Sequence, residues 1–143
     1  MVSPLFDRIM ILDDTSIDRY ITSYVVKQNN FSNEIIEFGM AAQALEYLER
    51  HFDQPEKLPQ LLFLDIRMPQ IDGFQFLEKL TLLPPVILEN CYIIVVSSTL
   101  DPADLRRSSE NPHVKKFLNK PINKSHLAEI RNELAAKNSE PSF

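Results

Sequence analysis

The sequence predicts a single α/β domain built on an open, five-stranded parallel β-sheet. Short apolar runs alternate with longer amphipathic stretches along its 143 residues, the pattern of repeated strand–helix–strand units. The apolar runs are continuous rather than alternating with polar residues, which indicates strands covered by helices on both faces of the sheet. We expect right-handed connections between such units and a doubly wound sheet with the strand order 2-1-3-4-5, which is common in this class.

Two strand–helix units are expected in the first part of the chain. Residues 8–12 (RIMIL) form the first strand and residues 34–38 (EIIEF) the second. The helix at 16–28 carries a mostly apolar face, which we expect to pack against the core. This face consists of Ile17, Ile21, Tyr24, Val25 and Gln28. The helix at 41–52 repeats the pattern through Ala41, Ala44, Leu45 and Leu48.

The third unit begins with the strand LLFL at residues 61–64. Its helix is marked by apolar residues at helical spacing, namely Phe74, Leu77 and Leu80. Pro84 and Pro85 end this helix, because proline lacks the backbone N–H that a helix interior needs. Residues 81–91 are therefore expected to be irregular.

The last two strands are expected at residues 92–96 (YIIVV) and 115–119 (KKFLN). The first of these is rich in β-branched residues and is expected to be central in the sheet. Between them, Asp101 followed by Pro102 is typical of a capped helix start. A final helix is marked by Leu127, Ile130 and Leu134.

Composition narrows the class of protein. With 15 Lys and Arg against 20 Asp and Glu, the net charge is −5, which argues against a cationic nucleic-acid surface. Cys91 is the single cysteine, so an intramolecular disulfide is impossible, as is usual in a reducing compartment. Signal-peptide and transmembrane patterns are not found. We expect one cytoplasmic domain over 1–143, with a core at about 8–134 and a frayed end at about 137–143.

Polar residues follow four of the expected strands at the point where each ends. They are Asp13-Asp14, Asp65, Ser97-Ser98 and Asn119-Lys120-Pro121. The carboxyl ends of parallel strands form the ligand-binding edge of such sheets, so these groups should converge. Three carboxylates against one lysine leave a negative site that a hard divalent ion such as Mg²⁺ would neutralise. The site would then suit a phosphoryl group, with Asp65 as the central candidate for a nucleophile.

Four motifs in this order resemble the receiver domain of two-component response regulators, the CheY-like fold. They are ILDD (11–14), LLFLDIRMPQIDG (61–73), VVSS (95–98) and KKFLNKP (115–121). The resemblance covers about residues 8–134 and implies the flavodoxin-like (βα)5 architecture. It also implies a stand-alone regulator that is phosphorylated on Asp65, rather than an enzyme with a separate substrate.

The resemblance carries roles to individual positions. Asp14 would bind Mg²⁺ directly, Asp13 mainly through water, and the backbone carbonyl of Arg67 would be a further ligand, with Mn²⁺ as a possible substitute ion. Lys120 would pair with a phosphoryl oxygen. Ser97 and Phe117 would be switch residues that respond to phosphorylation, and Pro121 is the proline that often follows a cis bond in the family.

Two positions depart from the commonest pattern of the family. Arg67 is bulky and cationic, and its side chain is expected to screen or attract the phosphoryl group and so alter dephosphorylation. Phe117 lacks the hydroxyl of a tyrosine, so switching there would depend on packing.

The resemblance further implies protein partners. A sensor histidine kinase or histidine phosphotransfer protein would donate the phosphoryl group, and a downstream protein would read the surface formed by residues 99–121. Direct contact with nucleic acid or membrane is not expected, and the chain would be a monomer or a phosphorylation-dependent dimer.

Three alternatives stay open. A haloacid-dehalogenase-like phosphatase also uses an aspartate at a strand end. That family requires a second aspartate two residues after the first, where this chain has Arg67. A pseudo-receiver would be a binding module without chemistry, which the complete set of acidic, hydroxyl and lysine positions disfavours. A flavodoxin-like cofactor binder is disfavoured because Gly39 and Gly73 do not form a phosphate loop after the first strand.

Overall fold

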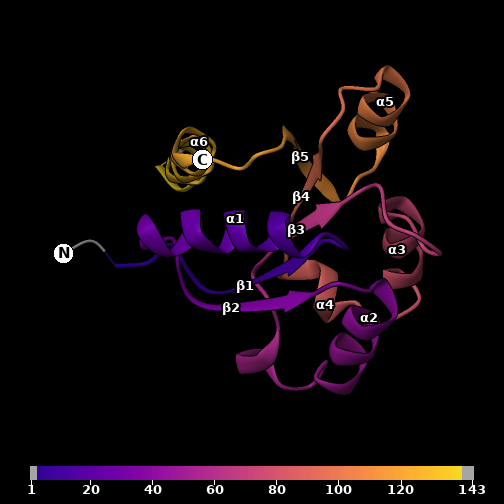
Figure 1. The fold of residues 1–143 in the computed structure, drawn as a ribbon. Helices are drawn as coiled ribbons and strands as arrows, with labels where there is room; N and C mark the ends of the chain where they lie inside the picture. The colour runs from indigo at the N-terminus through magenta and orange to yellow at the C-terminus, as the bar shows by residue number, and fades with distance from the viewer. Residues whose placement is uncertain (1–2, 140–143) are drawn as a thin grey trace.

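The computed structural model describes residues 3–139. In this range five strands form one parallel sheet in the order β2-β1-β3-β4-β5 (Figure 1). The strands are β1 (Phe6–Leu12), β2 (Ser32–Phe38), β3 (Leu61–Asp65), β4 (Tyr92–Ser97) and β5 (Val114–Asn119). All four strand pairs are parallel, so the predicted fold class and strand order are confirmed.

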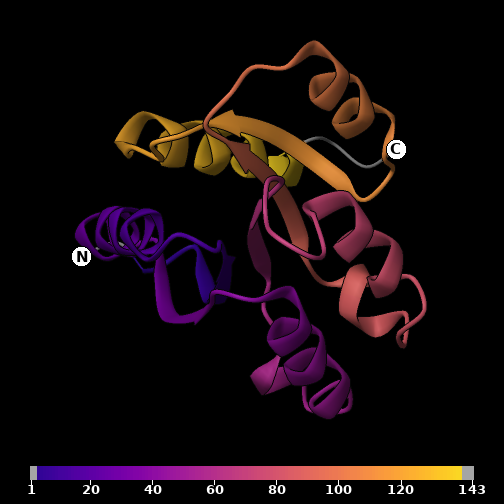
Figure 2. The same ribbon diagram turned by 45° about the vertical axis from the view of Figure 1, so that its right-hand side comes forward.

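Helices cover the sheet on both faces. Within residues 3–139 they are α1 (Ser16–Gln28), α2 (Ala41–Arg50), α3 (Gly73–Leu80), α4 (Val86–Glu89), α5 (Pro102–Glu110), α6 (Lys124–Ser139) and a 3₁₀ turn at Pro55–Lys57. Figures 1 and 2 show α1 and α6 on one side of the sheet and α2, α3 and α4 on the other. None of the described helices is both long and apolar enough to cross a membrane.

The strand residues alternate between two apolar cores, one on each face. Met10 and Leu12 pack with α2 and α3, whereas Ile9 and Ile11 pack with Val26 of α1 and with α6. Burial on both faces explains why the strands read as continuous apolar runs in the sequence.

Two helix predictions need correction. The expected apolar face of α1 is not its buried face, because Thr22, Ser23 and Val26 are buried, whereas Ile17 and Tyr24 are 64% and 53% exposed. Apolar spacing marked the residues but not the rotation of the helix, which packing against the sheet decides.

The segment 81–91 is not wholly irregular. After the two prolines a short helix, α4, forms and buries Ile87 against the core. At the other end, α6 includes residues 137–139 of the segment expected to be frayed, and residues 140–143 lie outside the described range.

Candidate functional site

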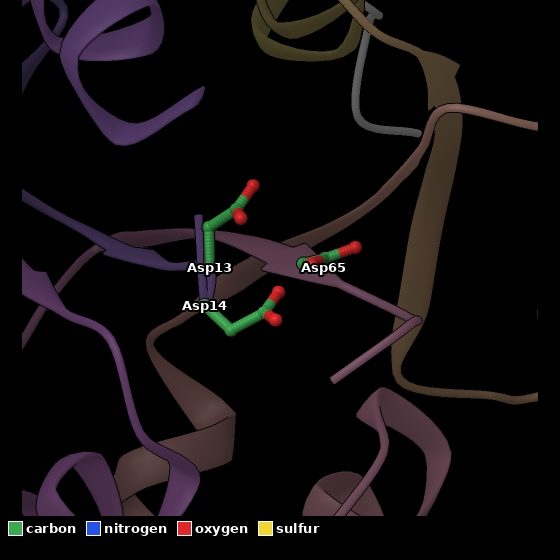
Figure 3. A group of neighbouring side chains, drawn as sticks. All are labelled: Asp13, Asp14 and Asp65. Atoms are coloured by element: carbon green, nitrogen blue, oxygen red, sulfur yellow. The ribbon is translucent and has the colours of Figure 1, made fainter. Parts of the chain in front are cut away.

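Three carboxylates gather where β1 and β3 end. Asp13 and Asp14 directly follow β1, and Asp65 is the last residue of β3, the neighbouring strand. Each offers a carboxylate oxygen within 4.8 Å of the others, and Figure 3 shows the three side chains at the neighbouring strand ends. Asp13 and Asp65 are buried and Asp14 is exposed, so a ligand can reach the cluster from the side of Asp14.

Lys120 reaches the same cluster from the end of β5. Its Nζ lies 2.6 Å from Oδ2 of Asp13 and 3.4 Å from Oδ1 of Asp65. The peptide bond between Lys120 and Pro121 is cis. The backbone N–H of Lys120 donates to the carbonyl of Ser97 at 2.8 Å, which fixes the lysine beside the end of β4.

Ser97 lies at the same edge of the sheet. In the β3–β4 ladder Asp65 is opposite Val96, so Ser97 is one residue beyond the level of Asp65. Ser97 is fully buried. Its Oγ accepts a 3.2 Å hydrogen bond from the backbone N–H of Thr99 and lies 3.3 Å from the Thr99 hydroxyl. The hydroxyl is therefore held by the loop that leads to α5.

The electrostatics of the cluster disfavour a charged Asp65 in the absence of a cation. Burial and the nearby Asp13 carboxylate raise the pKa of Asp65 to about 7, although Lys120 acts in the opposite direction. Burial lowers the pKa of Lys120, but the carboxylates of Asp13, Asp65 and Asp18 outweigh this and raise it overall. Oxygen ligands with excess negative charge suit a hard divalent cation such as Mg²⁺.

The loop after β3 is held close to the carboxylate of Asp65. The backbone N–H of Arg67 donates to Oδ1 of Asp65 at 3.2 Å, and Asp72 caps the N-terminus of α3. Gly73 begins that helix, and a Cβ there would lie 2.8 Å from the carbonyl oxygen of Asp65 and 2.9 Å from Cα of Ile66. A side chain at position 73 would therefore push the loop away from β3.

The Arg67 side chain turns away from the carboxylate cluster. Its Nη2 lies 2.7 Å from Oδ2 of Asp104 and 3.3 Å from Oδ2 of Asp101, both at the start of α5. The sequence analysis predicted only a helix start at Asp101. Asp101 does cap α5, accepting from the backbone N–H of Ala103, and the ion pairs with Arg67 are an additional role.

Phe117 lies on β5, apart from the carboxylates. It is half-buried and packs against the core on the α2–α3 face. A cavity of about 550 Å³ between β5 and α5 is lined by Phe117, Leu105 and Ser108, among others. The structure thus places the expected switch aromatic beneath α5, with space beside it.

Asp18 belongs to the site, and sequence reasoning missed it as a site residue. Its Oδ2 lies 3.0 Å from Nζ of Lys120. Asp18 stands in the first turn of α1, four residues after Asp14. An acidic residue one helical turn beyond the aspartate pair was the available signal, but only the fold shows that Lys120 reaches it.

Comparison with known proteins agrees with this arrangement. A family model described as "Response regulator receiver domain" matches residues 9–132. The chain belongs to the response regulator receiver family. Receiver domains of response regulators are typically phosphorylated by histidine kinases.

Among the curated relatives of this receiver is a probable methanogenesis regulatory protein, FilR2, from Methanothrix harundinacea. It is 29% identical over 88% of this chain and 79% of its own length. The two-component response regulator ORR1 of Oryza sativa subsp. japonica is 24% identical over 87% of this chain. The receiver spans about half of that relative, 54% of its length.

Solved structures show the same fold. A two-component response regulator from Cytophaga hutchinsonii superposes with a TM-score of 0.83 at 20% identity, over 91% of this chain and 97% of that one. The Mn²⁺-bound form of response regulator Rcp1 superposes with a TM-score of 0.66 at 21% identity, over 96% of this chain and 97% of that one.

Proposed function

We propose that this receiver is a signalling switch that accepts a phosphoryl group on Asp65. The observation that carries the proposal is the cluster at the carboxyl ends of the strands, where the buried Asp65 lies beside two other carboxylates and Lys120. A carboxylate can act as a nucleophile and form an acyl phosphate. A lysine beside it is suited to stabilising the charge on the transferring group.

Asp13, Asp14, Asp65 and the backbone carbonyl of Arg67 would hold Mg²⁺, or Mn²⁺ in its place. The donor set fits such an ion, because it consists of carboxylate and carbonyl oxygens. That a receiver of the same fold is known in a Mn²⁺-bound form supports this choice of ion. When bound, the ion would neutralise the carboxylates and attract phosphoryl oxygens.

The transfer step uses the ionised form of Asp65. One carboxylate oxygen of Asp65 attacks phosphorus, a new P–O bond forms, and the bond from phosphorus to the donor breaks. The electron pair of that bond leaves with the donor, which is a phosphohistidine of a kinase or phosphotransfer protein. Lys120 would stabilise a phosphoryl oxygen. The buried hydroxyl of Ser97, which now lies beside the Thr99 hydroxyl, would turn and donate a hydrogen bond to the phosphoryl group.

The output would be a change of surface. Repacking of Phe117 under α5 would alter the face formed by residues 99–121, which a downstream protein would read. We propose that the chain acts as one receiver domain in the cytoplasm, as a monomer or as a dimer formed on phosphorylation. In this role it catalyses only its own phosphorylation and dephosphorylation.

The test is intact-protein mass spectrometry after incubation with acetyl phosphate and Mg²⁺. Wild type should gain the mass of one phosphoryl group, and Asp65→Asn should gain none. Asp53→Asn is the matched control, because it removes an exposed carboxylate outside the site and should be phosphorylated like wild type. No gain in wild type, or an equal gain in Asp65→Asn, would contradict the proposal.

The phosphatase alternative predicts a different result in a second assay. Repeated turnover of small phosphate esters, lost in Asp65→Asn, would support a phosphatase over a switch. A pseudo-receiver would show neither the mass gain nor turnover.

A further inference from the structure

The attachment of α5 to the rest of the receiver is mainly polar. The buried side chains of α5 are those of Asp104 and Ser108, both polar. Leu105, its one leucine, is 39% exposed. The hydroxyl of Ser108 is buried and has no hydrogen-bond partner among the described residues. A helix with so little apolar burial has low local stability, so its polar contacts decide its position.

Two arginines connect α5 to the loop after β3 and to α3. Arg67, in the loop after β3, pairs with Asp104 at 2.7 Å and with Asp101 at 3.3 Å. Arg107 of α5 places its guanidinium 4.1 Å from the ring centroid of Phe74 in α3. Arg67 therefore connects α5 to the loop after β3, and Arg107 connects it to α3.

The buried carboxylate of Asp104 depends on its ion pair with Arg67. The side chain of Asp104 is 9% exposed and that of Arg67 is 59% exposed. A carboxylate this buried is costly when its partner leaves, whereas an exposed guanidinium can change partner at small cost. If Arg67 moves, Asp104 must reach water, and α5 must shift to allow it.

The backbone of Arg67 also contacts Asp65, the proposed phosphoacceptor. Its backbone N–H donates to Oδ1 of Asp65. A cavity of about 440 Å³ is lined by Asp14, Arg67 and Asp104, among others. The space between the cluster and α5 is thus open to the Arg67 side chain, which has an anionic partner at one side and the acceptor site at the other.

We propose that Arg67 is a positioning residue that couples Asp65 to α5 by exchanging partners. Its guanidinium binds Asp101 and Asp104 while Asp65 is free, and it moves to the phosphoryl oxygens once Asp65 is phosphorylated. The inference rests on the proposed function and adds a route from the site to α5 that is separate from Ser97 and Phe117.

The chemistry of the groups supports the exchange. A phosphoryl group adds charge of about −2 and three strong acceptor oxygens, which a planar guanidinium binds in bidentate fashion. Loss of Arg67 leaves Asp104 buried without its partner, which favours release of α5. Phosphorylation of Asp65 would thus break the ion pair between Arg67 and Asp104 and so release the weakly packed helix α5.

The first test measures hydrogen exchange of the α5 amides with Mg²⁺, with and without beryllofluoride, a stable mimic of the phosphoryl group. In wild type the mimic should speed exchange in α5 by about fivefold or more. In Arg67→Gln and in Asp104→Asn exchange should already be fast and should respond little. Arg106→Gln removes the same charge from an exposed position of the same helix and should behave like wild type.

The second test separates partner exchange from a merely structural role. Affinity for beryllofluoride, measured by titration, should fall about fivefold in Arg67→Gln, because the mimic loses a ligand. It should rise by a similar factor in Asp104→Asn, because Arg67 is no longer held by its buried partner. A structural role would weaken binding in both variants.

These results also separate the inference from the proposed function. Wild type that gains phosphoryl mass from acetyl phosphate but shows no change in α5 overturns the inference alone. Affinity that falls in both variants, or an undiminished α5 response in Asp104→Asn, does the same. Failure of wild type to gain phosphoryl mass overturns the proposed function and the inference together.

Discussion

The ammonium of Lys120 lies 3.0 Å from the carboxylate of Asp18, although 102 residues separate the two in the chain. With Asp13 at 2.6 Å and Asp65 at 3.4 Å, Lys120 has three carboxylate partners within residues 3–139. An ammonium has three N–H donors, so a phosphoryl oxygen that binds Lys120 must replace one partner. Asp18 is the most exposed of them, 32% against 4% for the others, and water can replace its hydrogen bond most readily.

Replacing Lys120 by methionine should destabilise the metal-free receiver by about 3 kcal/mol, because it leaves the buried Asp13 and Asp65 without their cation. Chemical denaturation in EDTA measures the loss. Saturating Mg²⁺ should restore part of it, since the ion supplies positive charge to the same carboxylates.

The matched control is Lys116→Met. Lys116 pairs with Glu133 at 2.7 Å and with Glu129 at 3.8 Å, and both carboxylates are about half exposed. Removal of this pair should cost about 1 kcal/mol or less, with no added response to Mg²⁺. Equal losses in the two variants, or equal rescue by Mg²⁺, would count against a buried cluster that depends on Lys120.

Mg²⁺ should raise the melting temperature of wild type in a concentration-dependent way, because a ligand that binds the folded state stabilises it by mass action. Asp14→Asn removes the exposed carboxylate of the cluster, a proposed ligand, and should weaken the apparent affinity for Mg²⁺ at least about tenfold. Differential scanning fluorimetry across a Mg²⁺ titration gives both values. An unchanged midpoint in Asp14→Asn would exclude this carboxylate as a ligand, and Asp53→Asn controls for loss of one charge.

The strands were predictable because each is an unbroken apolar run, and parallel strands must be connected by helices. Their order was expected because 2-1-3-4-5 is a common order of doubly wound sheets. The rotation of α1 and the presence of α4 were not. The four residues of α4 are too few for a periodic signal, and the helix exists because Ile87 enters the core. In α1, two small polar residues, Thr22 and Ser23, are buried, because packing against the sheet determines which face of the helix is buried.

The convergence of the site was equally predictable, since residues at the carboxyl ends of neighbouring strands meet at one edge. The partners supplied by helices were not. Asp18 and Asp104 come from α1 and α5, and their side chains meet Lys120 and Arg67 only once the crossovers have folded. The spacing of Asp18 from Asp14 marks it as a candidate. Sequence spacing does not show which residues pair, because the distance between them depends on how each helix lies on the sheet.

Stability of the metal-free receiver should depend on pH through Asp65. Burial and Asp13 raise its pKa from 3.8 to about 7. A group with a raised pKa contributes stability that is complete below its unfolded pKa and is lost as pH rises through the folded value. Wild type in EDTA should therefore lose stability between about pH 4 and pH 7, by about 2–4 kcal/mol.

Asp65→Asn tests this titration, because an amide has no proton to lose. Denaturation in EDTA should show the variant close to wild type at about pH 4 and more stable than wild type above pH 7. Asp53→Asn, at an exposed site, should show no such divergence. A stabilisation by Asp65→Asn that is the same at both pH values would mean that packing, and not the charge of Asp65, is responsible.

Gly73→Ala should destabilise the receiver by about 1–3 kcal/mol and reduce phosphorylation of Asp65. The added Cβ would lie 2.8 Å from the backbone oxygen of Asp65 and 2.9 Å from Cα of Ile66, and backbone atoms on a buried strand end cannot give way without shifting the loop. Urea denaturation measures the stability and intact mass the phosphorylation.

Gly39→Ala is the control for that substitution. Its Cβ would also approach another atom to 2.8 Å, but that atom is Nη1 of Arg19, at the far end of a flexible side chain. The arginine can move aside, so the cost should stay below about 1 kcal/mol, even though Nη1 also donates to the carbonyl of Asp13. Equal losses of stability in Gly73→Ala and Gly39→Ala would show that the close approach of Gly73 to the β3 backbone does not hold the loop after β3 in place.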